Sequence, residues 1–300
     1  MDKISLVFLG TGNAIPTEKR NHTGILASFA QENILFDCGE GMQRQLRFAK
    51  ISPTKITRIF ITHWHGDHML GLPGLFQTLA MSNYSKALHL YGPKGTRRFI
   101  QLIQELLMHI NINIQVHEIS SPGTVLETSQ FKINAGEMSH GTAALAYSLE
   151  LKEKVHLKKP AIKKLKLPNS PLLGDLQRGK DIIWKGKKIK AKAVTYKEPG
   201  KKVTIVLDTS FNQEAIQLAE DSDLLIAEAT FSSQDAEKAR EYQHLTSSDA
   251  ANIAKKSKSK KLIITHISQR YEHIPHIIEK EAKKIFKNTK IAKDLDKIII

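Results

Sequence analysis

Seven consecutive residues read THWHGDH and hold three histidines and one aspartate, directly after the apolar run 59–61. If that run forms a buried strand, the chain turns at its end, and His63, His65, Asp67 and His68 can converge on one rim of the fold. Imidazole nitrogen and carboxylate oxygen are donors that suit Zn²⁺ in proteins. So short a loop can place only two or three ligands on one ion. The motif therefore predicts two ions, with His63 and His65 on one and Asp67 and His68 on the other.

Each ion then needs ligands from distant parts of the chain. Asp208 and His266 each follow a mostly apolar run, 204–207 and 262–265, and His140 precedes another strand-like segment. A lone histidine more often makes an ordinary hydrogen bond, so each position is a weak candidate by itself. Together with the seven-residue motif, Asp208, His266 and His140 become candidate ligands.

The runs that precede these ligands form a weak internal repeat. NILFD and IFITH in the first half, ending at Asp37 and His63, are echoed by TIVLD and LIITH in the second, ending at Asp208 and His266. Short continuous apolar runs are typical of buried strands covered on both faces. The repeat predicts two similar halves, each built around such strands.

Helical periodicity fills the intervals between these strands. Leu72, Leu75, Phe76 and Leu79 keep the i, i+3, i+4, i+7 spacing of an amphipathic helix, and Ser247 opens another helical stretch. Strands mixed with helices predict a layered α/β fold in which the two halves pack sheet to sheet.

The composition suits one large folded domain over residues 1–300. Hydrophobic residues make up 41% and charged residues 25% of the 300 residues, ordinary values for a globular protein. No apolar run approaches the roughly 20 residues that a membrane span needs, and the apolar N-terminal stretch is interpreted as a strand rather than an export signal. The single cysteine, Cys38, cannot form an internal disulfide, which suits a reducing cytosol. We expect a cytoplasmic protein with no membrane partner.

The positive charge is concentrated in one segment. Residues 152–192 hold fourteen Lys or Arg against three acidic residues, a net +11 within the chain's total of +15. The segment is also interrupted by prolines and glycines and has few apolar residues, so we expect an inserted, flexible basic arm; a solvated basic loop is the alternative. Such a charge favours a polyanionic partner, because neutralised phosphates release counterions. Charge alone does not separate nucleic acid from an anionic membrane surface.

With its downstream His, Asp and His, the HxHxDH motif resembles the metallo-β-lactamase fold, a four-layer αββα sandwich flanked by helices. Within that fold the chain closely resembles the ribonuclease Z family of tRNA 3′-processing endonucleases, from Phe8 to about Tyr271. The matching pieces are FLGTG (8–12), PTEKRN (16–21), FDCGEG (36–41), THWHGDHMLGLPGL (62–75), SHG (139–141), LDT (207–209), HLT (244–246) and THISQRY (265–271). One departure is Ser170-Pro171, where the arm of the family carries Gly-Pro.

The resemblance implies a complete set of metal ligands for two Zn²⁺ per chain. One zinc would take three histidines, the other an aspartate and two histidines, and a second aspartate would bridge them. In that order the ligands are His63, His65 and His140; Asp67, His68 and His266; and Asp208. Asp37 is not a ligand in the family, and we expect it to cap the glycine-rich turn that follows it.

The same resemblance implies a reaction. A hydroxide activated by the two metals would attack phosphorus, and Asp67 would orient or deprotonate it. His244 matches a family histidine beside the scissile phosphate and would help the 3′ oxygen to leave; a hydrogen bond at the start of a helix is its alternative role. The product would be a tRNA with a 3′-hydroxyl and a trailer with a 5′-phosphate.

The implied partners are precursor tRNA and a second copy of the chain. The arm, 152–192, would be a tRNA-binding exosite that grips the RNA far from the cut, and the family usually pairs as a homodimer; no DNA partner is expected. One alternative is a hydrolase of the same fold acting on small phosphodiesters, which has no use for a segment of net charge +11. The other is a non-catalytic RNA-binding protein, which has no need for seven metal ligands.

Overall fold

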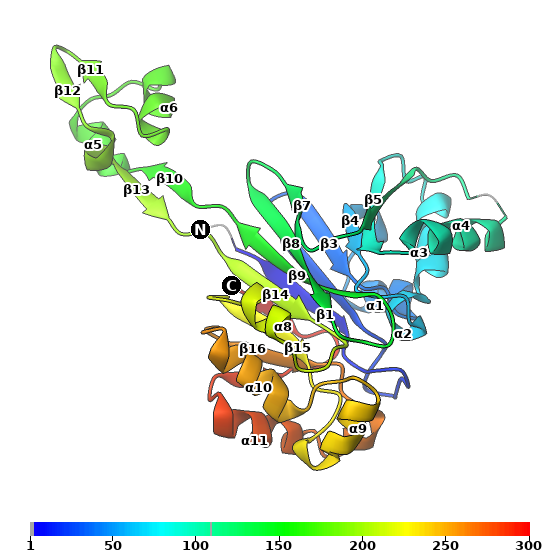
Figure 1. The fold of residues 1–300 in the computed structure, drawn as a ribbon. Helices are drawn as coiled ribbons and strands as arrows, with labels where there is room; N and C mark the ends of the chain where they lie inside the picture. The colour runs from blue at the N-terminus through cyan, green and yellow to red at the C-terminus, as the bar shows by residue number, and fades with distance from the viewer. Residues whose placement is uncertain (1–2, 109) are drawn as a thin grey trace.

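The structure is a computed structural model that describes residues 3–108 and 110–300. Two seven-stranded sheets face each other at its centre (Figure 1). The first sheet has the order β18-β1-β2-β3-β4-β5-β6, and the second has the order β17-β16-β15-β14-β9-β8-β7.

The strands of the first sheet are β1 (Ser5–Gly10), β2 (Gly24–Phe29), β3 (Glu32–Phe36), β4 (Arg58–Phe60), β5 (Leu88–Pro93), β6 (Ile114–Ile119) and β18 (Lys297–Ile299). Those of the second are β7 (Gly123–Glu127), β8 (Phe131–Met138), β9 (Ala144–Leu151), β14 (Lys202–Val206), β15 (Leu224–Glu228), β16 (Leu262–Thr265) and β17 (Thr289–Ile291).

Helices cover the outer face of each sheet. Against the first lie α1 (Met42–Phe48), α2 (Gly66–Met69), α3 (Leu72–Met81) and α4 (Thr96–Leu106), with the 3-10 turn η1 (Pro53–Lys55). On the second lie α8 (Gln213–Leu218), α9 (Ala236–Glu241), α10 (Ser247–Lys256) and α11 (His276–Ile285), with the 3-10 turns η2 (Ser233–Asp235) and η3 (Gln269–Tyr271). None of the described helices combines the length and the apolar content that crossing a bilayer requires.

Three apolar clusters hold these layers together. One fills the space between the two sheets, and the other two lie between each sheet and its helices. The periodic helix predicted from the sequence is α3, and its four spaced apolar residues are fully buried. The start predicted at Ser247 is the first residue of α10, where Thr246 and Asp249 form a capping box. The predicted four-layer αββα sandwich is therefore confirmed.

The internal repeat corresponds to two sets of parallel strands. β3 pairs in parallel with β4, and β14 pairs in parallel with β15, which pairs in parallel with β16. Because parallel strands end at the same edge of a sheet, the residues after β4, β14 and β16 are brought to one rim of the sandwich. The repeat is imperfect, since β15 separates the two strands of the second half that the sequence pairs.

The basic segment is a folded projection rather than an irregular loop. Strands β10 (Lys154–Leu157) and β13 (Thr195–Glu198) pair as an antiparallel stalk. Beyond it lie α5 (Lys159–Lys164), α6 (Pro171–Gln177), β11 (Ile182–Trp184), β12 (Lys187–Ile189) and α7 (Ala191–Val194). We refer to residues 154–198 as the arm, which extends away from the sandwich (Figure 1).

The arm has an apolar core of its own. Its six buried residues are Leu167, Leu176, Ile182, Ile189, Ala191 and Val194. This differs from the sequence expectation of a flexible segment with few apolar residues. Its helices of six, seven and four residues and its strands of three or four are too short to show a full apolar period, so the contributing residues look isolated among lysines.

Two central strands connect the arm to the rest of the molecule. β9 and β14 pair antiparallel, from Lys202↔Glu150 to Ile205↔Tyr147, and continue into the stalk strands β10 and β13. At their other ends, β9 begins four residues after His140 and β14 ends two residues before Asp208.

Candidate metal centre

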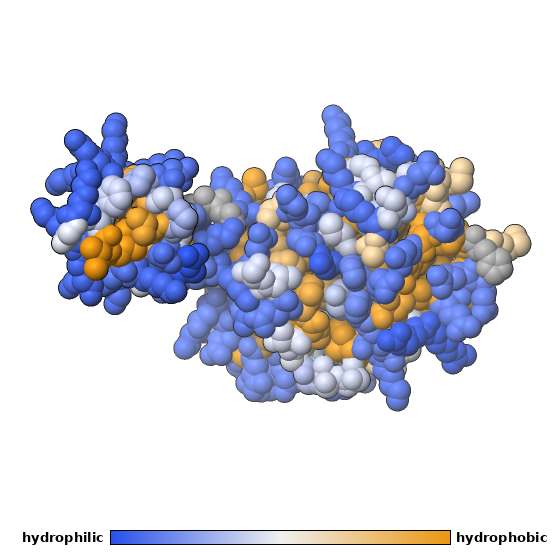
Figure 2. Space-filling model, turned by 90° about the horizontal axis from the view of Figure 1, so that it is seen from above, coloured by the Kyte–Doolittle hydropathy of each residue, from blue (hydrophilic) through white to orange (hydrophobic). Residues whose placement is uncertain are grey.

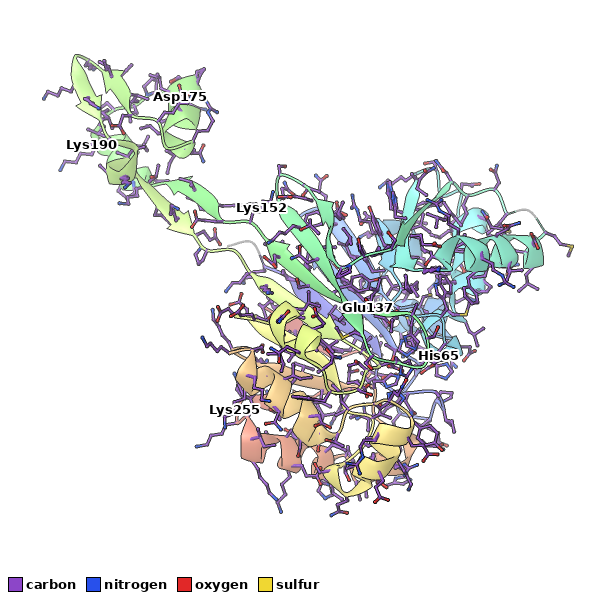
Figure 3. The ribbon with its side chains drawn as sticks, in the orientation of Figure 1. His65, Glu137, Lys152, Asp175, Lys190 and Lys255 are labelled. Atoms are coloured by element: carbon purple, nitrogen blue, oxygen red, sulfur yellow. The ribbon has the colours of Figure 1, made fainter. Side chains whose placement is uncertain are left out.

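All seven residues predicted as metal ligands meet at one rim of the sandwich. Four of them follow β4, His63 and His65 in the turn before α2 and Asp67 and His68 within α2, and the others follow β8, β14 and β16. His65 lies at the edge of the sandwich, far from Asp175 and Lys190 on the arm (Figure 3). The ligand-type atoms of these seven residues form two groups, and within each group all atoms lie within 4.8 Å of one another: His63, His65 and His140; and Asp67, His68, Asp208 and His266.

The first group is a triangle of three imidazoles. His65 Nδ1 lies 3.1 Å from His63 Nε2 and 3.1 Å from His140 Nε2. His63 is fully buried, whereas His65 is exposed at the mouth of the site. This group therefore opens toward solvent on the side of His65.

Apart from Asp208, the second group contains one carboxylate and two imidazoles, and it is buried. Asp67 Oδ2 lies 3.3 Å from His68 Nε2 and 3.2 Å from His266 Nε2, and the two ring nitrogens lie 3.2 Å apart. None of the three residues is more than 8% exposed. Nitrogen and oxygen atoms so close to one another in a dry site need a cation or shared protons between them.

Asp208 lies between the two groups, with one carboxylate oxygen toward each. Its Oδ2 is 3.6 Å from His63 Nε2 and 3.8 Å from His140 Nε2. Its Oδ1 is 3.3 Å from His68 Nε2 and 3.2 Å from His266 Nε2. This buried Oδ1 accepts no hydrogen bond from any described residue, despite the two ring nitrogens nearby. A buried acceptor that faces other acceptors is arranged for a cation.

Hydrogen bonds on the outer side of the site set which nitrogen of each ring faces inward. His140 Nδ1 lies 3.1 Å from the carbonyl oxygen of Gln243, which can only accept, so Nδ1 carries the proton. His68 Nδ1 likewise lies 2.7 Å from Asp37 Oδ2. In both rings the Nε2 lone pair is left for the centre, the arrangement that metal-binding histidines adopt.

Two threonines do the same for the remaining buried imidazoles. Thr62 Oγ1 donates to Asp37 Oδ2 and so accepts from His63 Nδ1 at 3.1 Å. Thr230 Oγ1 donates to a carboxylate of Glu228 and so accepts from His266 Nδ1 at 2.9 Å. Four inward-facing Nε2 lone pairs and two carboxylates therefore surround a space into which no outer hydrogen bond directs a proton.

Asp37 has a different role from the one expected from the sequence. Its Oδ1 accepts the backbone N–H of Thr62 at 2.7 Å, and its Oδ2 accepts from Thr62 Oγ1 and His68 Nδ1, both at 2.7 Å. The prediction that it caps the following glycine-rich turn is wrong, because its carboxylate points to the ligand loop. Asp37 fixes the orientation of that loop and of the His68 ring.

The carboxylates of the centre are ionised in this environment. When shared protons rather than a cation lie between these atoms, burial raises the pKa of Asp67, but the charge of His68 and hydrogen bonds from His266 and His68 outweigh it, so that pKa lies well below its usual range. Burial also opposes ionisation of Asp208, and the surrounding histidines, His266 first, lower its pKa well below the usual value. The site supplies two negative charges to whatever it binds.

His244 lies beside the centre, paired with a buried glutamate. Its Nδ1 is 3.0 Å from Glu228 Oε1 and 3.9 Å from Asp208 Oδ2. Burial lowers the pKa of His244, but Glu228 and Asp208 raise it further, to about 9, so the imidazole is protonated at neutral pH. Helix α10 is capped by Thr246, which removes the alternative that His244 starts this helix.

Glu228 was not identified from the sequence. It is fully buried at the end of β15 and also accepts hydrogen bonds from the backbone N–H groups of Thr209 (2.8 Å) and Thr230 (3.2 Å). The run 224–228 (LLIAE) is a third apolar strand that ends in an acidic residue. That shared pattern is the signal that could have found it.

Comparison with known proteins gives consistent relatives over the whole chain. Residues 4–159 match the family model described as Anti-Pycsar protein Apyc1. The ribonuclease Z of Enterococcus faecalis is 38% identical, and the match covers 99% of this chain and 97% of that protein. The ribonuclease Z of Methanothermobacter thermautotrophicus is 38% identical, and the match covers 97% of this chain and 95% of that protein.

Solved structures agree with these relatives. The short form of human tRNase Z has a TM-score of 0.72 and 28% identity, over 98% of both chains. The metallo-beta-lactamase fold protein YhfI from Bacillus subtilis has a TM-score of 0.73 and 19% identity over 100% of both chains, a likeness of fold alone. The first of these similarities includes the arm as well as the sandwich.

Proposed function

The chain belongs to the ribonuclease Z family over nearly its whole length, and we propose that it removes the 3′ trailer from precursor tRNA with two Zn²⁺ at this centre. Residues 4–159 also belong to the family of the Apyc1 model. It is a hydrolase, an endoribonuclease that leaves a 3′-hydroxyl on the tRNA and a 5′-phosphate on the trailer. The observation that carries the zinc proposal is Asp208, which presents one oxygen to each of two groups of ligand atoms.

The donor set fits two tetrahedral zinc ions. With Zn²⁺–ligand bonds of about 2.0–2.1 Å, the edges of a tetrahedral site are about 3.3–3.4 Å long. The closest separations among the ligand atoms run from 3.1 to 3.8 Å. His63, His65 and His140 would hold one ion, Asp67, His68 and His266 the other, and Asp208 both. With neutral imidazoles, the two carboxylates would offset only two of the four positive charges of the two zinc ions, so the centre would keep a net positive charge that attracts a phosphodiester.

The residues of the chain divide the chemical work. When bound, the two ions would supply an activated water as nucleophile and neutralise charge on the phosphoryl oxygens. Asp67 would orient that water and accept its proton. On the other side of phosphorus, His244 would give its proton to the leaving 3′ oxygen. Glu228 keeps His244 protonated and holds its ring in place.

Substrate recognition would rest on the arm and on a second copy of the chain. The stalk directs the arm away from the centre of its own subunit (Figure 3), so in a homodimer the arm of one subunit would serve the centre of the other. The arm would grip precursor tRNA away from the cut through shape and phosphate contacts, the usual mode for RNA helices. We place the enzyme in the cytoplasm, a reducing compartment compatible with its one cysteine.

One end-labelled precursor tRNA tests the proposal. We expect a single cut at the trailer, a 3′-hydroxyl on the tRNA and a 5′-phosphate on the trailer, with two zinc ions per chain by elemental analysis. Hydrolysis of bis(p-nitrophenyl) phosphate serves as the control for the bare chemistry. Hydrolysis of this small ester without cleavage of the tRNA would favour a small-phosphodiester hydrolase, and tRNA binding without either reaction would favour a non-catalytic binding protein.

A further inference from the structure

A large hollow lies on the arm. Its volume is about 890 Å³, and it is formed where the stalk meets α5 and α6. That volume falls in the range of roughly 300–1,000 Å³ that small-molecule sites occupy. We call it the arm groove. Phosphate contacts alone, the role proposed for the arm above, require no such hollow.

The walls of the arm groove are apolar and rest on the core of the arm. Leu157, Ala161, Ile162 and Leu173 line it, and all four are half-buried and pack against the six buried core residues. The shape of the groove is therefore set by the same packing that folds the arm. Figure 2 shows apolar residues reaching the surface of the arm among hydrophilic ones.

An aromatic ring stands at one side of the groove. Tyr196 is 51% exposed, and its ring lies over that of His156 on the neighbouring strand, with centroids 5.3 Å apart and planes at 24°. His156 is itself held by Glu198, whose Oε2 is 2.6 Å from His156 Nε2. The tyrosine ring is thus supported from behind by a second ring while half of its surface stays accessible.

The rim of the groove is basic. Lys158, Lys159 and Lys163 line it and are exposed. The basic segment 152–192, which covers most of the arm, has a net charge of +11. An apolar slot beside an aromatic ring and within a ring of lysines is complementary to a nucleotide, whose base is flat and apolar on its faces and whose phosphates are anionic.

We propose that the arm groove binds one unpaired nucleobase from a loop of the tRNA, stacked on Tyr196, with the flanking phosphates on the lysines of the rim. The inference rests on the proposed function, because it takes tRNA as the ligand of the arm. A double-helical stem shows a protein mainly phosphates and sugars, whereas loop bases can turn outward and stack on aromatic side chains. The groove thus gives the arm a contact with a base, in addition to its contacts with phosphate charges.

The first experiment measures binding of mature tRNA, which lacks a trailer, at several salt concentrations. Tyr196→Ala should weaken binding by about 5- to 150-fold, the equivalent of roughly 1–3 kcal/mol for one stacked base, without changing the slope of log Kd against log salt. Tyr196→Phe keeps the ring and should bind like the wild type. Lys159→Gln is the charge control and should reduce the slope by about 0.7–0.9.

The second experiment changes the tRNA and has a readout on the wild-type protein alone, so it remains decisive if Tyr196→Ala disturbs the arm. A set of tRNAs, each with one loop nucleotide made abasic, is titrated with the wild-type enzyme and with Tyr196→Ala. One abasic tRNA should bind the wild type more weakly by the same factor as the alanine variant loses, and the alanine variant should not distinguish that tRNA from the intact one.

Equal binding of all the abasic tRNAs to the wild type overturns the proposal, as does a loss in Tyr196→Ala that appears only as a changed salt slope. A shift of Tyr196→Ala from dimer to monomer in sedimentation, with tRNA affinity per subunit unchanged, assigns the groove to a second copy of the chain instead. In these cases the wild type still cleaves precursor tRNA. Failure of the proposed function is a different result, in which the wild type does not cleave it at all.

Discussion

The metal centre and the arm are built on opposite principles. At the centre, most of the proposed ligands are buried, and each of the four buried or half-buried imidazoles has an outer hydrogen bond that fixes its proton. On the arm, the basic side chains are mostly exposed, and the acidic ones are engaged locally: Asp175 with Arg178, Asp181 with Lys188, and Glu198 with His156. Metal binding at the centre depends on single atoms in fixed places. RNA binding by the arm depends on the sum of many charges, each of which can be replaced, on the surface of a small core. Substitutions should therefore act abruptly in one region and gradually in the other.

The largest effect is expected at the residue shared by both groups of ligands. Asp208→Ala should abolish cleavage of precursor tRNA and of bis(p-nitrophenyl) phosphate and lower the zinc content, because a buried site that loses a ligand cannot keep its geometry. Elemental analysis and both activity assays measure this, and binding of mature tRNA through the arm should persist. His63→Ala should behave in the same way. Two metals per chain with normal turnover in either variant would contradict the assignment.

His244→Ala tests a residue of the centre that contacts the ligands without belonging to them. Turnover under single-turnover conditions should fall by about 10²–10⁴-fold, while zinc content and tRNA binding stay unchanged. In the wild type the rate should also fall as the pH rises through the pKa of His244, about 9 before the neighbouring cations lower it, because the acid is protonated only below that pKa. An unchanged rate in the variant would make His244 merely structural.

Removal of the arm tests whether recognition is separable from chemistry. Leu157 and Thr195 face each other as the last pair of the stalk, so residues 158–194 can be replaced by Asn-Gly as a two-residue hairpin turn. This removes twelve Lys or Arg and two acidic residues. KM for precursor tRNA should rise by about 10²–10³-fold, and each lost phosphate contact should take about 0.7–0.9 from the salt slope.

Hydrolysis of bis(p-nitrophenyl) phosphate is the control for the armless enzyme and should be unchanged, since the arm lies far from His65. Processing of precursor tRNA with the original KM and salt slope would show that the arm is a solvated appendage. Recognition would then have to come from the surface around Lys19 and Asn21.

Asp37→Asn tests the outer hydrogen bonds of the centre. The amide keeps the shape but accepts less strongly from His68 Nδ1 and Thr62, so the ligand loop is held less firmly. Zinc affinity or turnover should fall by about 10–100-fold, measured by competition with a chromogenic chelator. The fold should be kept, and the loss of turnover should be reversed by added zinc. A variant with wild-type zinc affinity would mean that the loop is fixed by its neighbours alone.

The smallest effect on chemistry is expected in the core of the arm. Leu176 is fully buried there, and Leu→Ala at such a site costs about 2–5 kcal/mol, a large loss for so small a core. Leu176→Ala should abolish hydrogen-exchange protection in the arm and weaken tRNA binding at least as much as Tyr196→Ala, without changing hydrolysis of the small ester. Ile183 is 75% exposed, and Ile183→Ala is the matched control that should leave the arm protected. Equal protection in both variants would show that the arm does not depend on this core.

The sequence predicted the sandwich, the family and the gathering of the seven ligand residues because each depends on local signals. Continuous apolar runs ending in Asp or His place a polar residue at a strand end, and parallel strands bring such ends together. The core of the arm could not be predicted in this way, since residues such as Leu176 and Ile189 lie in elements shorter than two helical turns or four strand residues. Glu228 was missed because β15 lies between the two strands that the repeat pairs, and Asp37 was misassigned because its partners, Thr62 and His68, are brought near it only by the fold.

The continuous path of β9 and β14 has a consequence for how such enzymes can change. Each strand has a proposed ligand beyond one end, His140 or Asp208, and the arm at the other. Insertions, deletions or replacements between Leu151 and Lys202, on the side of the arm, leave the pairing between Glu150 and Lys202 intact, so they do not displace the proposed ligands. The arm, and with it the substrate preference, can thus be replaced as a module during evolution, while the catalytic end of the same two strands stays unaltered.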